Sequence, residues 1–131
     1  MASSGTITVA YSGGGITKSD TITKSSTARV QWEESVADES TDAQINCPTI
    51  DVSELVLVYI KSTQDVTIET NDGTTPDDTL TLKANEPYVW WTAAPFTNVL
   101  TTDITTNVFV TNASGASATV TFEAILDTTP A

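Results

Sequence analysis

Threonine alternates with large apolar residues through most of this 131-residue chain. The pattern is clearest at residues 118–124, where alanine, valine and phenylalanine occupy every second position and threonine or glutamate the others. Successive side chains of a β-strand point to opposite faces, so this segment has one buried face and one wet face. No segment shows the 3.6-residue period of an amphipathic helix. The chain is therefore predicted to be all-β.

Strand boundaries follow from this alternation and from the turn residues between apolar segments. The predicted strands are 6–11, 20–23, 28–33, 55–61, 66–70, 79–83, 88–92, 107–112 and 118–126. Asn112-Ala113-Ser114-Gly115 is predicted to be a tight turn that pairs the last two strands antiparallel. Residues 34–48 are acidic and poor in large apolar side chains, so they are predicted to form a surface loop with one helical turn at 36–43.

This density of short strands predicts an antiparallel two-sheet β-sandwich of jelly-roll type with about eight strands. An immunoglobulin-like sandwich is the alternative, because strand order cannot be read from a single sequence. Residues 16–131 are predicted to form this one domain. Residues 1–15 end in Ser12-Gly13-Gly14-Gly15, which is interpreted as a flexible hinge. They form either a mobile N-terminal arm that reaches a neighbouring subunit or an added edge strand.

Two adjacent tryptophans, Trp90 and Trp91, cannot share one face of a strand. Residues 55–60 pose the same problem, since every one of them is apolar. The chain therefore carries more apolar surface than one small core obviously needs, and such a surplus indicates contact with another chain. Burial of both faces within one compact fold is the alternative. Trp91 shares its face with Val89 and Ala93, and this face is predicted to be the core.

Tyr88 and Trp90 lie on the opposite face of the same strand, which makes them the first candidates for a partner interface. The neighbouring apolar segment adds Val56, Val58 and Ile60 to this candidate interface. Aromatic side chains are the type that concentrates in the buried centres of interfaces.

Charge and composition exclude several classes of function. A net charge of -12 repels phosphate backbones and anionic lipids, so neither nucleic acid nor a membrane is an expected partner. Neither a secretory signal nor an apolar run of about 18 residues is present, so folding in a cytosolic compartment is expected. The chain has no histidine, which removes histidine-ligated zinc and Ser-His-Asp or Cys-His catalysis. Cys47, the only cysteine, has no nearby cation to lower its pKa and is interpreted as a passive thiol.

Acidic side chains offer the remaining candidate sites. Residues 71–78 place three carboxylates in one loop. A solvated turn is the favoured interpretation because EF-hand spacing is absent, and a calcium site is the alternative. A second acidic group could supply the carboxylate pair of a glycosidase, and it consists of Glu33, Glu34, Asp38, Glu39 and Asp42. Nothing in the sequence selects a pair from them. No catalytic residue, metal ligand or cofactor is therefore predicted, and the chain is not expected to be an enzyme.

Aromatic rings exposed on a β-sandwich could also stack on sugars. Trp32, Trp90 and Trp91 would then make the chain a carbohydrate-binding module, whereas burial of these rings in the core would not. Asn112-Ala113-Ser114 matches a glycosylation sequon but is interpreted as turn sequence.

Several segments of the second half share one style. They are the apolar strand Leu55 to Ile60, Asp65-Val66-Thr67-Ile68-Glu69-Thr70, the segment Leu80 to Pro87, the Trp90-Trp91 strand, and the closing hairpin from Val108 to Phe122. In this style the chain resembles small β-sandwich virion proteins of tailed bacteriophages, especially the decoration (cement) proteins that bind outside the major capsid shell. The resemblance covers about residues 50 to 127.

The resemblance implies a non-enzymatic structural protein that decorates and stabilises a phage capsid. The implied partners are the major capsid protein and further copies of the chain, with a trimer favoured. The implied location is the capsid exterior in the virion, and the host cytoplasm during assembly. A carbohydrate-binding module and a neck, tail or fibre component are the alternatives.

Overall fold

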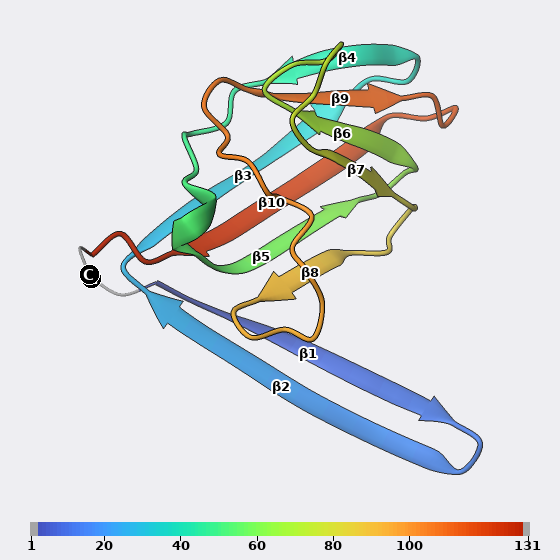
Figure 1. Ribbon diagram of the computed structural model, residues 1–131. Helices are drawn as coiled ribbons and strands as arrows, with labels where there is room; N and C mark the ends of the chain where they lie inside the picture. The colour runs from blue at the N-terminus through green and yellow to red at the C-terminus, as the bar shows by residue number, and fades with distance from the viewer. Residues whose placement is uncertain (1–2, 130–131) are drawn as a thin grey trace.

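The computed structural model describes residues 3–129, and nearly all of its regular structure is antiparallel strand. In chain order the elements are β1 (Ser3–Gly13), β2 (Ile16–Ser26), β3 (Ala28–Val36), β4 (Ser40–Ile45), the 3₁₀ helix η1 (Val52–Glu54), β5 (Leu55–Ser62), β6 (Val66–Thr70), β7 (Thr79–Leu82), β8 (Tyr88–Trp91), β9 (Val108–Asn112) and β10 (Ala118–Leu126). They form one hairpin, β1-β2, and two 4-stranded sheets of order β3-β10-β5-β8 and β4-β9-β6-β7 (Figure 1). The prediction of an all-β chain with antiparallel sheets is confirmed.

The two sheets arise from a nested pattern of strand pairing. β3 pairs with β10, β4 with β9, β5 with β8 and β6 with β7, and every pair is antiparallel. Two further antiparallel pairs, β5-β10 and β6-β9, complete the sheets. We call the two sheets and the segments that connect them the body. Its first strand, β3, therefore lies beside its last strand, β10.

An apolar core fills the space between the two sheets. Val58, Ile60 and Phe122 from one sheet pack with Ile68 and Val110 from the other, and each of these side chains is at most 4 % exposed. Full burial of such a side chain contributes about 1.5–3 kcal/mol. This core is the main source of stability of the body.

The β1-β2 hairpin forms a further layer on the outer face of the β3-β10-β5-β8 sheet. It contacts β5 and β10 there. Figure 1 shows the hairpin running along this sheet and past β8, with its turn projecting away from the rest of the molecule. Residues 16–26, predicted to belong to the sandwich, are therefore the second strand of a projecting hairpin.

Residues 34–48 are not the loop with a helical turn that the sequence predicts. β3 continues to Val36, and β4 occupies Ser40–Ile45. β4 is an edge strand of its sheet, and all its side chains except Ile45 are at least partly exposed. An edge strand of this kind needs few apolar residues, which is why an acidic, polar segment can still form a strand.

The turn after β9 reverses the chain but does not pair β9 with β10, contrary to the prediction. The two strands belong to different sheets. The Asn112 side chain is fully buried and donates hydrogen bonds to the carbonyl oxygens of Val36 (3.0 Å) and Ala116 (2.9 Å). Its Oδ1 accepts from the backbone N–H of Ser114 (3.1 Å). Asn112 thus holds the turn where the chain passes between sheets, and this role leaves no free amide at the sequon.

Candidate interaction surface

The β1-β2 hairpin is closed by a two-residue glycine turn. Gly14 and Gly15 have φ angles of 56° and 83°, and a type I′ turn requires positive φ at both central positions. The twist of this turn matches that of the strands, and the pairing runs without interruption from Ser3↔Ser26 to Gly13↔Ile16. The glycine stretch interpreted as a flexible hinge is therefore a defined hairpin turn.

The register gives the hairpin two chemically different faces, because directly opposite residues of antiparallel strands share a face. Between Gly5 and Gly13, one face holds Gly5, Ile7, Val9, Tyr11 and Gly13 opposite Lys24, Ile22, Asp20, Lys18 and Ile16. We call it the apolar face. The other face of the same stretch consists of serine and threonine with one alanine, Ala10.

The base of the apolar face is covered by the body. Ile7 is 7 % exposed and packs against Leu57 and Ile125 on the outer side of the sheet. Gly5 lies over the same two side chains, since a Cβ at Gly5 would be 3.5 Å from Leu57 Cδ2 and 3.7 Å from Ile125 Cγ1. The hairpin backbone therefore approaches the sheet closely at this end.

Polar contacts fasten the same end of the hairpin. Arg29 on β3 donates to the backbone carbonyl of Ser4 and forms an ion pair with Glu123 on β10 (2.9 Å). Thr27, directly after β2, shares a hydrogen bond with Thr128 (2.9 Å between the hydroxyl oxygens). The hairpin is thus anchored at its base by the first and last strands of the body.

The tip of the apolar face is uncovered. Tyr11, Ile16 and Val9 are 62 %, 55 % and 45 % exposed. The Tyr11 ring lies over Gly13, where a Cβ would come within 2.9 Å of the Tyr11 hydroxyl. Lys18 is directly opposite Tyr11 and Asp20 is directly opposite Val9, so this end of the face carries one charge of each sign. We call Val9, Tyr11, Ile16 and Lys18 the hairpin tip.

The hairpin also differs in charge from the rest of the molecule. Residues 3–26 contain two lysines, Lys18 and Lys24, and one acid, Asp20, so their net charge is +1. The other three basic and sixteen acidic side chains give the rest of the chain a charge of -13, and together these values make the total of -12. A slightly cationic hairpin therefore projects from a strongly acidic body.

A second exposed apolar site lies in the loop after β8. Phe96 is 44 % exposed, and apart from the hairpin tip no other large apolar residue among residues 3–129 is as exposed. It borders a shallow groove of about 390 Å³ whose apolar lining also includes Val52, Trp90 and Leu100. Its ring packs edge-on against Trp91, with 5.7 Å between the ring centroids. We call this feature the Phe96 groove.

Three carboxylates lie beside the Phe96 groove. Asp51, Asp78 and Asp103 each accept a hydrogen bond, 2.9 Å long, from a backbone N–H group of a residue that lines it. Hydrogen bonds from the side chain and backbone of Ser53 lower the pKa of Asp51 and favour its charged form. The groove therefore combines an apolar floor with an acidic setting.

Tyr88 and Trp90 fix the loop that carries Phe96. The Tyr88 hydroxyl donates to Asn98 Oδ1 (2.6 Å) and accepts from the backbone N–H of Val99 (2.9 Å). Burial raises the pKa of Tyr88, so this hydroxyl remains protonated at neutral pH. Trp90 Nε1 donates to the backbone carbonyl of Phe96 (3.2 Å). Both residues thus hold the loop that carries Phe96, and Trp90 also lines the groove.

The residues proposed as an interface from the sequence do not form one exposed surface. Val58 and Ile60 are 0 % and 1 % exposed and lie in the core between the sheets, where they offer no surface to a partner in this fold. Tyr88 and Trp90 are half-buried and pack against the same core. Val56 is half-buried and packs against the Ile7 cluster on the outer face.

The prediction that Val89, Trp91 and Ala93 face the main core is wrong. Tyr88 and Trp90 face the core between the sheets, whereas Val89 and Trp91 pack against the cluster beneath the hairpin. Alternation correctly places the two tryptophans on opposite faces. It could not say which face meets the other sheet, because β8 is covered on both sides.

Sequence reasoning missed the hairpin tip. The sequence predicts a strand for Val9 and Tyr11 and a hinge before Ile16, and this does not put the three residues on one face. A usable signal is present, because Gly14-Gly15 between two strand-like segments is typical of a type I′ hairpin.

The acidic loop at residues 71–78 is held by its own hydrogen bonds. Asp72 Oδ1 accepts from the backbone N–H groups of Thr74 (2.7 Å) and Thr75 (3.1 Å), and these bonds lower the pKa of Asp72. Within residues 3–129, no three His, Cys, Asp or Glu side chains form a group that could hold a metal ion. The observed contacts are those of an Asx-type turn.

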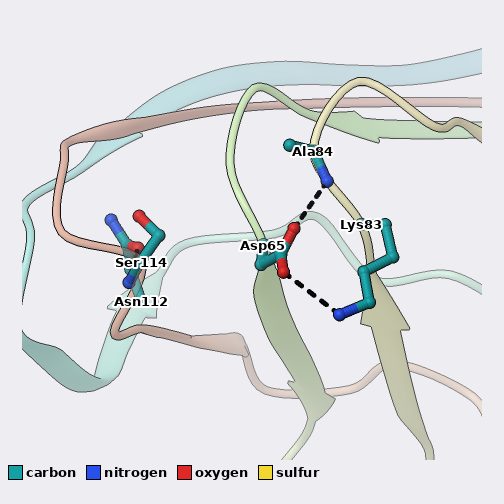
Figure 2. A network of polar contacts seen from close by, with 5 residues as sticks. All are labelled: Asp65, Lys83, Ala84, Asn112 and Ser114. Atoms are coloured by element: carbon teal, nitrogen blue, oxygen red, sulfur yellow. Dashed lines mark hydrogen bonds and ion pairs between the residues drawn. The ribbon is translucent and has the colours of Figure 1, made fainter.

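A polar network lies at the end of β6 and β7. Figure 2 shows Asp65 accepting from the backbone N–H of Ala84 (2.8 Å) and pairing with Lys83 (3.1 Å). The hydrogen bond from the Ala84 N–H is the largest cause that lowers the pKa of Asp65, and the hydrogen bond from Lys83 is the next. Asn112 and Ser114 lie across from this pair on the turn after β9. Because these groups bind one another and the backbone, we interpret the network as support for the turns.

Cys47 and Trp32 form an internal pair. Trp32 Nε1 donates to Cys47 Sγ (3.3 Å), and the Trp32 ring stacks on Phe122 with 5.2 Å between centroids. Burial raises the pKa of the Cys47 thiol, which disfavours the reactive thiolate. This setting supports the interpretation of Cys47 as a passive thiol.

The chain was also compared with known proteins. No family model matches it, and no similar characterised protein or solved structure is found. A separate search of residues 3–129 finds no helix long and apolar enough to cross a membrane.

Proposed function

We propose that the protein is a non-enzymatic structural component of a phage virion that decorates and stabilises the capsid by binding the major capsid protein. The observation that carries this proposal is the projecting hairpin, whose apolar face is covered at Ile7 and bare at Tyr11 and Ile16. Exposed apolar residues that continue an already buried face are typical of surfaces that another chain covers.

The strand order supports the finer fold assignment on which the resemblance to decoration proteins depends. Nested pairing of first with last strand, second with second-last and so on is the arrangement of a jelly roll. Jelly rolls are common among viral capsid and lectin domains. In a constant-type immunoglobulin sandwich the first and last strands lie in different sheets, whereas here β3 and β10 pair antiparallel, so we favour the jelly roll.

The charge distribution suits a position on the outside of a DNA-filled shell. A chain with a net charge of -12 is repelled by phosphate backbones and stays soluble before assembly in the host cytoplasm. Its contacts must then be made by specific apolar patches. The same contact is repeated many times over a symmetric shell. Burial of apolar surface contributes about 25 cal/mol per Å², so even a modest patch can stabilise the particle despite the entropy cost of association.

A carbohydrate-binding module is the second candidate, and one observation favours it. Phe96 and Trp90 line an open groove, and aromatic rings in such a position can stack on sugar rings. Trp32 supports this alternative less, since its ring is already stacked on Phe122. A neck, tail or fibre component would share most features of a decoration protein.

Binding to expanded capsids tests the proposal. Purified protein should co-sediment with expanded shells and saturate at a fixed number of copies per shell, whereas an unrelated protein of similar charge should stay in the supernatant. Cryo-electron microscopy of virions should then place it on the capsid exterior. Density at the neck or tail instead would reassign its position. Absence of co-sedimentation together with tryptophan quenching by oligosaccharides would favour the sugar-binding alternative.

A further inference from the structure

We infer that the hairpin tip of one copy occupies the Phe96 groove of a second copy of the chain. This inference rests on the proposed structural role, which requires copies to assemble, and it names the surfaces that join them. The bare face that carries the proposed function would then be covered by a second copy, and the assembled ring rather than a single hairpin would bind the capsid.

The distribution of exposed apolar residues is the first argument. The large apolar residues with the greatest exposure among residues 3–129 are Val9, Tyr11, Ile16 and Phe96. Val9, Tyr11 and Ile16 belong to the hairpin tip, and Phe96 borders the groove. A contact between these two places would cover all four together, and it would continue a face that is already buried at Ile7.

Charge complementarity is the second argument and identifies the occupant. The hairpin carries Lys18, Lys24 and Asp20 and has a net charge of +1, whereas Asp51, Asp78 and Asp103 lie beside the groove in a body of net charge -13. A slightly cationic hairpin with an apolar tip and an apolar groove in an acidic setting are therefore present on the same chain. Complementary charges favour this orientation over tip-to-tip or body-to-body contact.

The position of the tip makes the contact intermolecular. Figure 1 shows the hairpin turn projecting away from the body, and Phe96 stays exposed on the same molecule. Each copy would thus give its tip to one neighbour and receive a tip from another. Such a head-to-tail contact closes into a ring when the rotation permits. A ring agrees with the symmetric oligomer that the resemblance implies, and the serine and threonine face of the hairpin would remain in water.

Disulfide trapping tests the pairing directly. Chains carrying Tyr11→Cys and chains carrying Phe96→Cys, co-expressed and then oxidised, should form disulfide-linked dimers. Each variant alone should stay uncrosslinked, because the head-to-tail contact never brings two tips together. The matched control combines Thr8→Cys with Phe96→Cys, since Thr8 lies on the polar face of the same strand. The native Cys47 is buried and should not contribute.

The mass in solution gives an independent measurement. Light scattering should report a multiple of the 13.8 kDa chain mass for the natural sequence and 13.8 kDa for a variant with Tyr11→Ser and Ile16→Ser. Thr8→Ser and Thr17→Ser on the polar face should leave the mass unchanged. An unchanged melting temperature at a concentration where all three are monomeric would show that the fold is intact, because Tyr11 and Ile16 are exposed.

Other outcomes overturn either the inference or the proposed function. Crosslinking of Tyr11→Cys chains with one another would indicate a symmetric tip-to-tip contact, and a monomeric natural chain would exclude the ring. A monomer that still saturates expanded capsids would sink the inference and leave the proposed function standing. Crosslinking between Tyr11→Cys and Phe96→Cys chains, together with failure of the natural chain to bind capsids, would leave the inference standing and overturn the proposed function.

Discussion

Gly15 determines the shape of the hairpin at the scale of a single residue. Its φ of 83° lies in a region that L-residues enter at a cost of about 1–2 kcal/mol. We expect Gly15→Ala to weaken the β1-β2 pairing by about 1 kcal/mol, which corresponds to roughly fivefold faster hydrogen exchange of the amides near the turn. Native-state exchange followed by NMR would measure it.

Gly5→Ala is the matched control for this change. Its Cβ would lie in ordinary contact with Leu57 and Ile125, so we expect hairpin protection to be kept. Equal protection in the natural chain and Gly15→Ala would show that the turn does not set the pairing.

Glu69 is a residue whose charge works against the fold. Burial is the largest cause that raises the pKa of this carboxyl. The neighbouring carboxyls of Asp42 and, to a smaller extent, Asp72 raise it further. A carboxyl with a raised folded-state pKa stabilises the fold below its unfolded pKa, and this contribution is lost as pH rises through the folded value. We therefore expect Glu69→Gln to raise the melting temperature at pH 7 and to change it little at about pH 3, where the glutamate is protonated in both states. Calorimetry at both pH values, with Glu86→Gln at an exposed site as control, checks this; a lower melting temperature at pH 7 would contradict it.

Among the elements, the hairpin and the body are separable. The hairpin shares no strand pairing with either sheet in the described residues, and its buried contribution is centred on Ile7. We expect a chain without residues 1–26 to keep a cooperative unfolding transition and to lose more than the about 1.5–3 kcal/mol of one buried aliphatic side chain, because Leu57 and Ile125 are uncovered together with the loss of Ile7. Urea denaturation measures the loss, and Ile7→Ala in the full chain should give a smaller part of it. A truncated chain without a cooperative transition would show that the body depends on the hairpin.

The same contrast explains which elements the sequence could predict. The strands β6 (Val66–Thr70) and β10 (Ala118–Leu126) have the predicted bounds because buried and partly exposed side chains alternate strictly over 66–70 and 118–124. β2 (Ile16–Ser26) was largely missed, since most of its side chains are exposed and nothing forces an apolar pattern on it. β4 is an edge strand and fails for the same reason. Burial of one face produces the alternation of apolar and polar residues, so a strand with little buried surface has no clear pattern in the sequence.

Strand partners and the candidate site were harder to predict than strand positions. Asn112 marks a chain reversal, but only the fold decides that β9 and β10 then join different sheets. Alternation separates Trp90 from Trp91, yet both faces of β8 are covered. The exposed tip at Tyr11 can be identified only when the hairpin register is known, because the solvent exposure of a side chain depends on which parts of the chain pack against it.

For the whole molecule, nested pairing predicts slow folding. β3 pairs with β10, so Ala28 lies beside Leu126, and the body cannot form before distant segments meet. Folds dominated by such contacts reach the native state in milliseconds to seconds. We expect this range for Trp32 fluorescence in a chain with Trp90→Phe and Trp91→Phe, because the Trp32 ring stacks on Phe122 across the β3-β10 pair. Stopped-flow refolding measures the rate, and folding within microseconds would contradict the prediction.

Nested pairing has a further consequence while the protein is being made. β3 emerges from the ribosome before β4 to β9, but its partner β10 follows all of them. The β1-β2 hairpin, whose pairing is local, can close at once, whereas the body must wait until β10 has emerged. A nascent chain would therefore display the hairpin before the domain that carries the groove exists, so a neighbour's hairpin can be bound only after β10 has been translated.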